Sequence, residues 1–584
     1  MKYSELLVTT PIEETWALKD SKKLIFLGEN CKTYSNKRLR IDINNKTLKD
    51  PWSNRGSRKF FFENAEKIYE RALEYIHINL NKYHGTNKSK IYWQILVGPW
   101  LKIFINSTYH PWEVIKDLKN SDWNGKTIAI NNLEETQKSY DIYDFYKKRL
   151  AHAWNHHLCC QIIEEFYGSE IFDHIEKPQK LFVEEKFEDE SSTHFMKNNT
   201  KRFINLLSQK LNNSSYFFHK TYLTKYHQIA LAMKLRVMPF FSKESIRLKE
   251  STYDESLRDS LSSSSKYNTP DPFENFLFSK IFKYIPINYL EGYIESKNYL
   301  ISRKWPENPK FIVTANSHWI DDIFKLYAAE KVENGSKLKL IIHGGHGKAA
   351  YSDFENHEIK ISNKIFSWGW EEYSTKIIKG FYIKNKLKNS PKDHALQVLF
   401  SEWPYQILFK STPSYEQFIK NHIPEQLEFI SNLSSHIRNK LLIKPADKNN
   451  SFEEIISEKF NDVNFVYQEK SFNELIKTSK VVIHSYNETP IVETLANNIP
   501  TISFWNQDHW EQCPSSIKIY DLLKEAKIFH PSPRSAALHL NNIWDNVDEW
   551  WNDVKVQEAV KEHNDWFARK TEKPIKELIK FIKS

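Results

Sequence analysis

The stretch VVIHSYNETPIVETLANNIPTISFW, residues 481–505, gives the clearest indication of the fold. An apolar run ends at His484, hydroxyl and amide residues follow, and an apolar helical pattern covers 488–497 before Pro500 opens a second apolar run. Short strands that alternate with helices of this length are typical of βαβ units and a parallel sheet. The stretch therefore predicts a strand, a crossover helix and a second strand.

The same alternation extends over residues 310–526. Further strands are predicted in KFIVTAN, KLKLIIHGGHG, KIFSWGW, ALQVLFSEW, KLLIKPAD and VNFVYQ. Because the series occurs on both sides of residue 390, we predict an α/β fold with two doubly wound Rossmann-like lobes. The expected domains are an N-terminal lobe at 1–385 with a largely helical insertion around 110–300, a C-terminal lobe at 386–545, and helices at 546–584 that cross back to the first lobe.

The composition is that of a soluble globular protein. The chain has 584 residues, which favours two lobes or more, and 40% of them are hydrophobic and 27% charged. The net charge of +9 is spread along the chain without a dense Lys/Arg run, so no nucleic-acid partner is expected. Four cysteines in so long a chain do not form a disulfide framework and favour the cytoplasm.

No membrane span is expected. The N-terminal residues lack a signal-peptide pattern. The longest apolar region, residues 91–105, is interrupted by Gln94, Pro99 and Lys102 and is shorter than the roughly 20 apolar residues of a transmembrane helix. Peripheral contact with a membrane stays open.

Polar residues follow the strand that ends at His484. In open parallel sheets, ligands bind outside the carboxyl ends of the strands. The start of the next helix offers unpaired backbone N–H groups and a partial positive charge, which suit a phosphate. Ser485 and Thr489 add hydroxyl donors, and Glu493 can accept hydrogen bonds from a ribose diol. The alternative is that Ser485 or Asn487 caps the helix and that Glu493 is a surface residue.

The first lobe has a counterpart in LIIHGGHG. Here His343 and His346 flank Gly344 and Gly345 at the carboxyl end of a strand. Glycines allow a substrate to approach the backbone, and a histidine can transfer a proton near neutral pH. A metal site is the alternative, but the segment has no zinc-like thiolate spacing.

Two weaker groups of residues complete the candidates. Asn316 and His318 follow the strand FIVTAN and are further cleft candidates. In AHAWNHHLCC, His152 and His156 form an i,i+4 pair close to two cysteines. A helix with hydrogen-bonded core histidines explains that pattern better than a metal site does.

Five segments together carry a family resemblance. They are ELLVTTPIEETW…IFLGENC, YWQILVGPWL, HGGHG…HEIKISNKIFSWGW, HSYNETPIVETLANNIPTISFWNQDHWE and IFHPSPRSAALHLNNIWDNVDEWW. In this order the chain resembles a bacterial family of transferases from O-antigen and other surface-carbohydrate loci. That family is similar in layout to GT-B glycosyltransferases, in which two Rossmann-like lobes hold a nucleotide sugar and the C-terminal lobe binds most of the nucleotide.

The resemblance implies a glycosyltransferase of bacterial surface polysaccharide biosynthesis. The donor is a nucleotide sugar, with CMP-activated acidic sugars as one class, and the acceptor is a saccharide or a lipid-linked saccharide. The layout requires no metal ion and no resident cofactor. The expected location is the cytoplasm, at the inner face of the plasma membrane.

The chemistry assigns roles to the candidates. Transfer must neutralise a departing phosphate and, in an inverting enzyme, deprotonate the acceptor hydroxyl. The first candidate for the base is His343, and the second is Glu14 or Glu13 in TTPIEETW. Thr10 and Glu13 fit a helix capping box equally well, which is the alternative for this segment. The predicted donor-binding residues are Lys444, His484, Ser485, Thr489, Glu493 and Thr494.

Three other functions fit the same sequence. A transferase of polyol- or sugar-phosphate groups shares the phosphate-binding strand ends. A non-catalytic carbohydrate-binding protein needs no nucleotide, and an epimerase or hydrolase can use the same scaffold.

Overall fold

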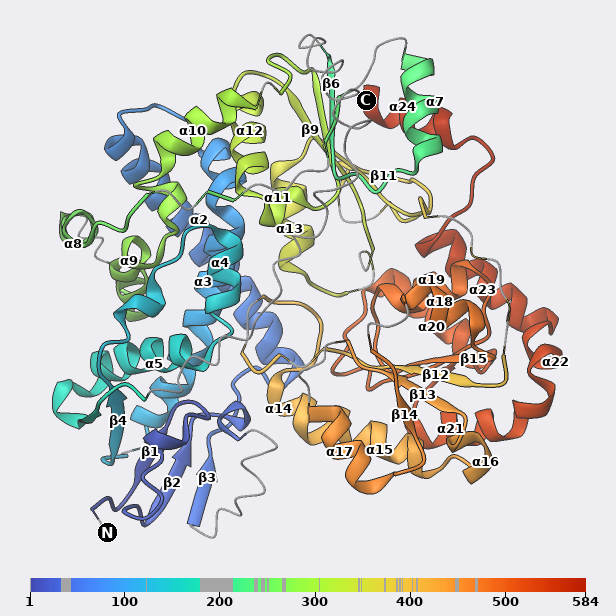
Figure 1. The fold of residues 1–584 in the computed structure, drawn as a ribbon, viewed down its shortest axis with the longest axis horizontal. Coiled ribbons are helices and arrows are strands. Elements are labelled where there is room, and N and C mark those ends of the chain that lie inside the picture. The colour runs from blue at the N-terminus through green and yellow to red at the C-terminus, as the bar shows by residue number, and fades with distance from the viewer. Residues whose placement is uncertain are drawn as a thin grey trace.

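The computed structural model of the chain is an assembly of parallel α/β sheets (Figure 1). It describes residues 2–32, 44–121, 123–178, 214–235, 240–242 and 247–584, apart from gaps at 249–250, 265–268, 304, 345–346, 348, 372–373, 385–386, 388–389, 391, 402, 406–407, 447–450 and 468–470.

The N-terminal sheet has the strand order β3-β2-β1-β4-β5. Its strands are β1 (Leu6–Val8), β2 (Lys23–Phe26), β3 (Asn44–Thr47), β4 (Lys126–Ile130) and β5 (Phe172–Ile175). Its helical elements are η1 (Glu13–Thr15), η2 (Glu29–Cys31), α2 (Arg55–His84), α3 (Lys90–Lys119), η3 (Glu134–Gln137), α4 (Ile142–Lys148) and α5 (His152–Tyr167).

The middle sheet has the order β11-β10-β9-β8-β6-β7. Its strands are β6 (Tyr216–His219), β7 (Phe240–Ser242), β8 (Phe311–Thr314), β9 (Lys337–Ile341), β10 (Lys364–Phe366) and β11 (Ile377–Ile378). The helices of this part are α7 (Lys225–Leu235), α8 (Glu255–Ser264), α9 (Pro272–Tyr284), α10 (Tyr293–Ser302), α11 (Ser317–Ile320), α12 (Asp322–Glu333) and α13 (Asp353–Ile361). The chain reverses its direction of winding between β6 and β8, so their carboxyl ends form a topological switch point.

The C-terminal sheet has the order β14-β13-β12-β15-β16-β17, in which β12 and β15 form the switch point. Its strands are β12 (Ala395–Val398), β13 (Leu441–Lys444), β14 (Asn464–Phe465), β15 (Val481–His484), β16 (Thr501–Phe504) and β17 (Phe529–His530). Its helices are α14 (Tyr415–Gln417), α15 (Ile423–Ser431), α16 (Ser435–Arg438), α17 (Ser451–Lys459), α18 (Phe472–Thr478), α19 (Thr489–Ala496), α20 (Pro514–Glu525), α21 (Pro533–Ile543), α22 (Val547–Trp551), α23 (Val554–Phe567) and α24 (Pro574–Lys583).

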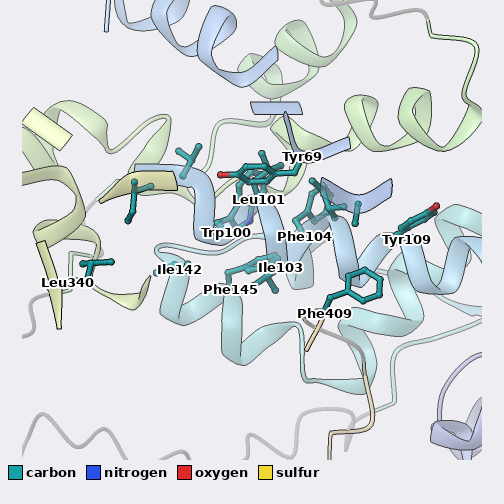
Figure 2. Packing of buried hydrophobic residues seen from close by; sticks show 14 of the residues in the cluster. Tyr69, Trp100, Leu101, Ile103, Phe104, Tyr109, Ile142, Phe145, Leu340 and Phe409 are labelled. Carbon is teal, nitrogen blue, oxygen red and sulfur yellow. The ribbon is translucent and has the colours of Figure 1, made fainter. Parts of the chain in front are cut away.

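Helix α3 is the hydrophobic centre of the first half of the molecule. It contains the apolar region 91–105, and its side chains are buried without interruption from Tyr92 to Tyr109. A helix that is apolar on all sides is stable when protein surrounds it. Figure 2 shows Trp100 and Phe104 of α3 among residues of α2, α4, β9 and the loop after β12. In the described part of the chain, no helix combines the length and apolar character that a bilayer crossing needs.

The loops at the carboxyl ends of the sheets meet one another around Glu511, which follows β16. Its carboxylate lies 2.8 Å from Arg58 Nη2 of α2 and accepts a hydrogen bond from the Tyr351 hydroxyl at 2.7 Å. Arg58 and Glu511 are both buried. The Ala350 N–H also donates to the Glu511 carbonyl at 3.0 Å. This buried ion pair therefore joins elements of all three sheets.

The C-terminal helix returns to the middle sheet. Lys339 of β9 donates to the carbonyl of Phe581 in α24 at 2.6 Å, and the Arg569 N–H donates to the Trp368 carbonyl at 2.7 Å. Gly369 has a φ of +154°, and an added Cβ would lie 2.5 Å from the Trp566 carbonyl oxygen. The segment after α23 is thus fixed closely against the loop after β10.

The predicted α/β class with doubly wound parallel sheets is confirmed, and so are the strands predicted between 310 and 505. The expected N-terminal lobe contains two sheets, because residues 110–300 contribute β4 and β5 to one sheet and β6 and β7 to the other. Residues 260–264, whose serine-rich composition is typical of a loop, form the end of α8. The domain boundaries at 385 and 545 stay a prediction.

Candidate functional site

The start of α19 lacks a side-chain cap. The N-cap residue is Glu488, which makes no capping hydrogen bond and pairs instead with Lys410. Asn487 accepts a hydrogen bond from the Tyr520 hydroxyl at 2.5 Å, so it is occupied elsewhere. The alternative in which Ser485 or Asn487 caps this helix is therefore wrong. Because Pro490 has no N–H, the backbone groups that the start of α19 could offer to an anion are those of Thr489 and Ile491.

Ser485 adds a buried hydroxyl beside this helix start. Its side chain is fully buried, and Oγ has no hydrogen-bond partner among the residues that the structure describes. An unpaired buried hydroxyl costs free energy, so such a group in a native structure requires an explanation. A phosphate oxygen would supply the missing partner if the turn after β15 opened, because in this conformation the hydroxyl is closed off from solvent.

His484 and Thr494 lie behind the helix start. Both are fully buried, and His484 Nε2 is 3.1 Å from Thr494 Oγ1, which also donates to the Ile491 carbonyl at 3.0 Å. In this structure the two side chains orient β15 and α19 relative to each other. They do not reach solvent.

Glu493 is buried, so the alternative that it is a surface residue is wrong. Its carboxylate pairs with Lys384, whose ammonium also lies 5.7 Å from the centre of the Trp368 ring. Burial, and then the nearby Glu493 carboxylate, raise the pKa of the Tyr382 phenol. Lys384 comes from the segment between β11 and β12, so this pair ties α19 to the connection with the middle sheet.

Two lysines bring positive charge to the carboxyl edge of the C-terminal sheet. Val398 pairs with Lys444 on one side and with His484 on the other, so the ends of β13 and β15 flank β12 about 10 Å apart. Lys410 reaches the start of α19 through its pair with Glu488. Lys444 was a candidate from the sequence, whereas Lys410 was not, because its place at α19 depends on how the loop after β12 folds.

The glycine turn of the middle sheet contacts α19 directly. Gly344 has a φ of +149°, and an added Cβ would lie 2.5 Å from Thr489 Oγ1 and Cγ2. The structure thus brings the predicted turn of one sheet to the predicted phosphate-binding helix of another. Gly345 and His346 lie outside the described residues.

His343, one residue before this contact, is part of a second group of polar side chains. Its ring stacks on that of Tyr222 with centroids 6.2 Å apart and planes at 25°. The Tyr222 hydroxyl accepts a hydrogen bond from Asn316 Nδ2 at 2.9 Å. Tyr222 follows β6 and Asn316 follows β8, so the hydrogen bond crosses the switch point of the middle sheet.

Tyr222 is a candidate that the sequence reasoning missed. Its backbone is left-handed, with a φ of +57°, and 54% of its surface is exposed. A left-handed tyrosine is strained, and an exposed ring gains little from burial in return. Strain of this kind is frequent at functional sites.

Other candidates lie apart from this contact. His318 is buried with its Nε2 3.2 Å from Glu358 Oε1, so in this conformation a ligand does not reach it. Glu13 and Glu14 are exposed in η1 of the N-terminal sheet, so they belong to a different sheet from His343. The residue before η1 is Ile12 and makes no side-chain cap, which excludes a Thr10 capping box.

The histidine helix α5 is structural, as expected. His156 Nδ1 lies 2.7 Å from Thr9 Oγ1, and its Nε2 lies 3.6 Å from Cys160 Sγ. His152 Nδ1 lies 2.7 Å from the Tyr405 hydroxyl. Over the described ranges, no cluster of three or more His, Cys, Asp or Glu side chains is arranged to hold a metal ion.

A pocket lies elsewhere, between the ends of β2 and β3 and helix α14. Its lining includes Glu29, Asp50, His110 and Glu416. Asp50 Oδ1 lies 3.2 Å from His110 Nε2, and that imidazole, with other hydrogen bonds, outweighs burial and holds the pKa of Asp50 below its usual value. Three carboxylates would repel a phosphate, so this pocket does not suit a nucleotide.

A protein-family model described as "LIC12162 family transferase" matches residues 5–582. The chain belongs to this family, and the transferase class predicted from the sequence is confirmed. No curated protein matches the chain.

The chain also has weak likenesses to solved structures. These include TarM (12% identity, 47% of this chain and 54% of that chain, TM-score 0.29), HepE of Anabaena in complex with UDP and glucose (10%, 61% and 96%, 0.34) and MurG of Acinetobacter baumannii (9%, 63% and 99%, 0.30). The chain thus spans about half the length of TarM. Scores this low assign neither a fold nor an activity to the chain.

Proposed function

We propose that this member of the LIC12162 transferase family is a glycosyltransferase of the GT-B layout. It moves a sugar from a nucleotide-activated donor to a saccharide or lipid-linked acceptor. The observation that carries the proposal is the contact of Gly344 with Thr489, because it joins a histidine-bearing turn to an uncapped helix start. Donor phosphate and reacting hydroxyl would be held beside this contact, which itself has no room for a ligand.

The phosphate side is supported by three features of the C-terminal sheet. The α19 start offers backbone N–H groups, and Ser485 offers a buried hydroxyl without a partner among the described residues. Lys444 ends β13, and Lys410 would supply positive charge when its pair with Glu488 opens. Donors held in place before reaction stabilise the charge that develops on a departing phosphate. Glu493 is our candidate for the ribose diol, which requires its pair with Lys384 to open.

The acceptor side is supported by the middle sheet. His343 is half-buried at the end of β9, and a neutral imidazole there can take a proton from an acceptor hydroxyl as the bond to the anomeric carbon forms. Asn316 and Tyr222 hold polar groups beside it. Glu13 and Glu14 stay second candidates for the base.

The pathway is a finer part of the proposal. The sequence resemblance to families of surface-carbohydrate loci favours O-antigen or capsule synthesis in the cytoplasm, at the inner face of the plasma membrane. A CMP-activated acidic sugar is one donor class to test. Transfer of a polyol- or sugar-phosphate would use the same phosphate-binding residues, and the mass of the product separates the two reactions.

A nucleotide screen tests the proposal. The purified chain is heated with CMP, UDP, GDP, dTDP or ADP, and a nucleotide at 100 times its Kd should stabilise the fold by about 2.7 kcal/mol. The paired variants are Ser485→Ala at the helix start and Ser431→Ala, an exposed serine at the end of α15. The stabilising nucleotide should lose its effect with Ser485→Ala only. If no nucleotide stabilises the wild type, the carbohydrate-binding alternative is favoured.

A second experiment tests the base. With the donor class known, His343→Gln should bind the nucleotide as the wild type does and lose transfer by roughly 100-fold or more. The control is His174→Gln, an exposed histidine of β5. A His343→Gln enzyme with full activity would point to Glu14 or Glu13 instead.

A further inference from the structure

Helix α7 exposes an apolar face. Tyr226, Ile229 and Met233 are 67%, 61% and 68% exposed, and their spacing places them on one side of the helix. Leu231 and Leu235 on the other side are buried. Three large apolar side chains in a row on a surface helix indicate an interaction site.

Lysines surround this face. Lys225 and Lys234 of α7 are exposed. Helix α24 packs against α7 (Figure 1) and adds the exposed Lys576, Lys580 and Lys583. The turn before α24 adds the exposed Lys573 next to one exposed carboxylate, Glu572. The Glu577 carboxylate of α24 is already paired with Arg569. We call these exposed apolar and lysine side chains the α7–α24 surface.

The α7–α24 surface adjoins the candidate reaction site. Helix α7 begins three residues after Tyr222, whose ring stacks on His343. Tyr222 and Tyr226 are four positions apart in the sequence and are both exposed. A partner that covers α7 would therefore come close to the proposed base.

We infer that the α7–α24 surface docks on an anionic lipid bilayer. Exposed Tyr, Ile and Met side chains enter the headgroup region, and lysines around them bind lipid phosphates. A bilayer explains this surface better than a symmetric dimer does. In a symmetric dimer the lysines of one copy would lie against the same lysines of the other copy and repel them. The docking would hold His343 near a lipid-linked acceptor, and only this last step rests on the proposed function.

Vesicle sedimentation tests the inference without donor or acceptor. The full chain is mixed with vesicles of phosphatidylcholine alone, or of equal parts phosphatidylcholine and phosphatidylglycerol. Binding should require the anionic lipid and should weaken as salt is raised. Each lysine near an anionic surface raises partitioning roughly fivefold, so Lys576→Gln with Lys580→Gln should lower it by roughly 25-fold.

The apolar face has its own variants. Tyr226→Ser, Ile229→Ser and Met233→Ser together should abolish sedimentation and leave the thermal midpoint near that of the wild type, since all three side chains are exposed. The matched control is Ile517→Ser with Leu522→Ser, two exposed apolar residues of α20, which should bind vesicles normally.

Three results would overturn the inference. One is the absence of binding to either vesicle, and another is equal loss of binding in the α20 control. The third is a concentration-dependent dimer that the α7 variant abolishes, which would assign this face to a second copy. Nucleotide binding by Ser485 and α19 is measured separately, so failure here leaves the proposed function intact.

Discussion

Gly344 and Thr489 touch across two sheets that are far apart in the sequence. An added Cβ on Gly344 would lie 2.5 Å from Thr489 Oγ1 and Cγ2, and φ at Gly344 is +149°. Side chains rarely adopt that backbone conformation, and real Cβ contacts essentially never fall below 3.0 Å. The position therefore requires glycine for two independent reasons, and the two loops meet where only backbone fits.

Replacing this glycine should separate the loops. Gly344→Ala is expected to lower the free energy of unfolding by about 1–3 kcal/mol for the backbone and by a further amount for the collision with Thr489. Gly335→Ala is the matched control, because Gly335 has a φ of +92° and nothing within 4 Å of an added Cβ. Urea denaturation of the two variants isolates the collision.

A second substitution checks that the stability loss of Gly344→Ala comes from the collision with Thr489. Thr489→Ala removes the two atoms nearest the added Cβ and should restore part of the stability lost by Gly344→Ala. Equal losses from Gly344→Ala and Gly335→Ala would mean that the loops separate at no cost, and the contact would then not define the site.

Tyr222 is expected to lower the stability of the fold and to support transfer activity. Asparagine tolerates the left-handed backbone better than tyrosine, so Tyr222→Asn is expected to keep stability or raise it by about 1 kcal/mol. Transfer activity should fall, because the ring beside His343 is lost. Both are measured on the same preparation, by urea denaturation and by product formation.

The control for Tyr222 is Lys527, in the turn between α20 and β17. Lys527 is exposed and has the same φ of +57°, so Lys527→Asn should have the same effect on stability and none on transfer. Wild-type activity in Tyr222→Asn would show that the tyrosine ring takes no part in the reaction.

The sequence could locate helix α19, the proposed phosphate-binding helix, because its signal is local. Ser485 and Thr489 stand between an apolar strand and an apolar helix, and a parallel sheet presents such residues at its carboxyl edge. Which side chains of α19 face the interior cannot be predicted from the local sequence. Thr494 is one turn further along α19 and faces His484 inside the fold, which only the packing of helix on strand decides.

The middle sheet was harder to predict. Strand β6, Tyr216–His219, has only four residues, and its partner β7, Phe240–Ser242, has three, so their alternation with helix α7 is faint in the sequence. Without β6, Tyr222 could not be assigned to a strand end. The separate N-terminal sheet was missed for a similar reason, because β1 has three residues and its neighbour β4 starts at Lys126, far along the chain.

The junction of the three sheets should depend on one buried ion pair. The side chains of Arg58 and Glu511 are 4% and 3% exposed, and Glu511→Ala leaves Arg58 without its carboxylate. Removing one partner of a buried pair costs about 3–5 kcal/mol, so a large drop in the denaturation midpoint is expected. Arg58→Met with Glu511→Leu should recover part of this loss, since no charge is then left buried.

An exposed pair on the same helix is the control for that experiment. Lys59 and Glu63 are 4.0 Å apart with side chains 69% and 56% exposed. Glu63→Ala should leave the midpoint almost unchanged. If Glu511→Ala has as small an effect as Glu63→Ala, the junction is not held by this pair.

Acid should destabilise the fold through its buried histidines, with His156 as the clearest case. Burial lowers the pKa of His156 from 6.5 to about 3, and its neighbours are Thr9 and Cys160 rather than a carboxylate. Above pH 6.5 this histidine is neutral in both states and does not affect the pH dependence. As the pH falls below 6.5, the unfolded chain takes up a proton that the folded chain refuses, so stability decreases until the pH reaches about 3. Between pH 7 and pH 5 this amounts to about 2 kcal/mol for His156.

Urea denaturation at a series of pH values measures this effect. The free energy of unfolding should fall less steeply with acid in His156→Gln than in the wild type, while the exposed His174→Gln on β5 should follow the wild type. Identical slopes for wild type and His156→Gln would mean that this histidine is protonated inside the fold, and the hydrogen bond with Thr9 would then have to run from the ring to the hydroxyl oxygen.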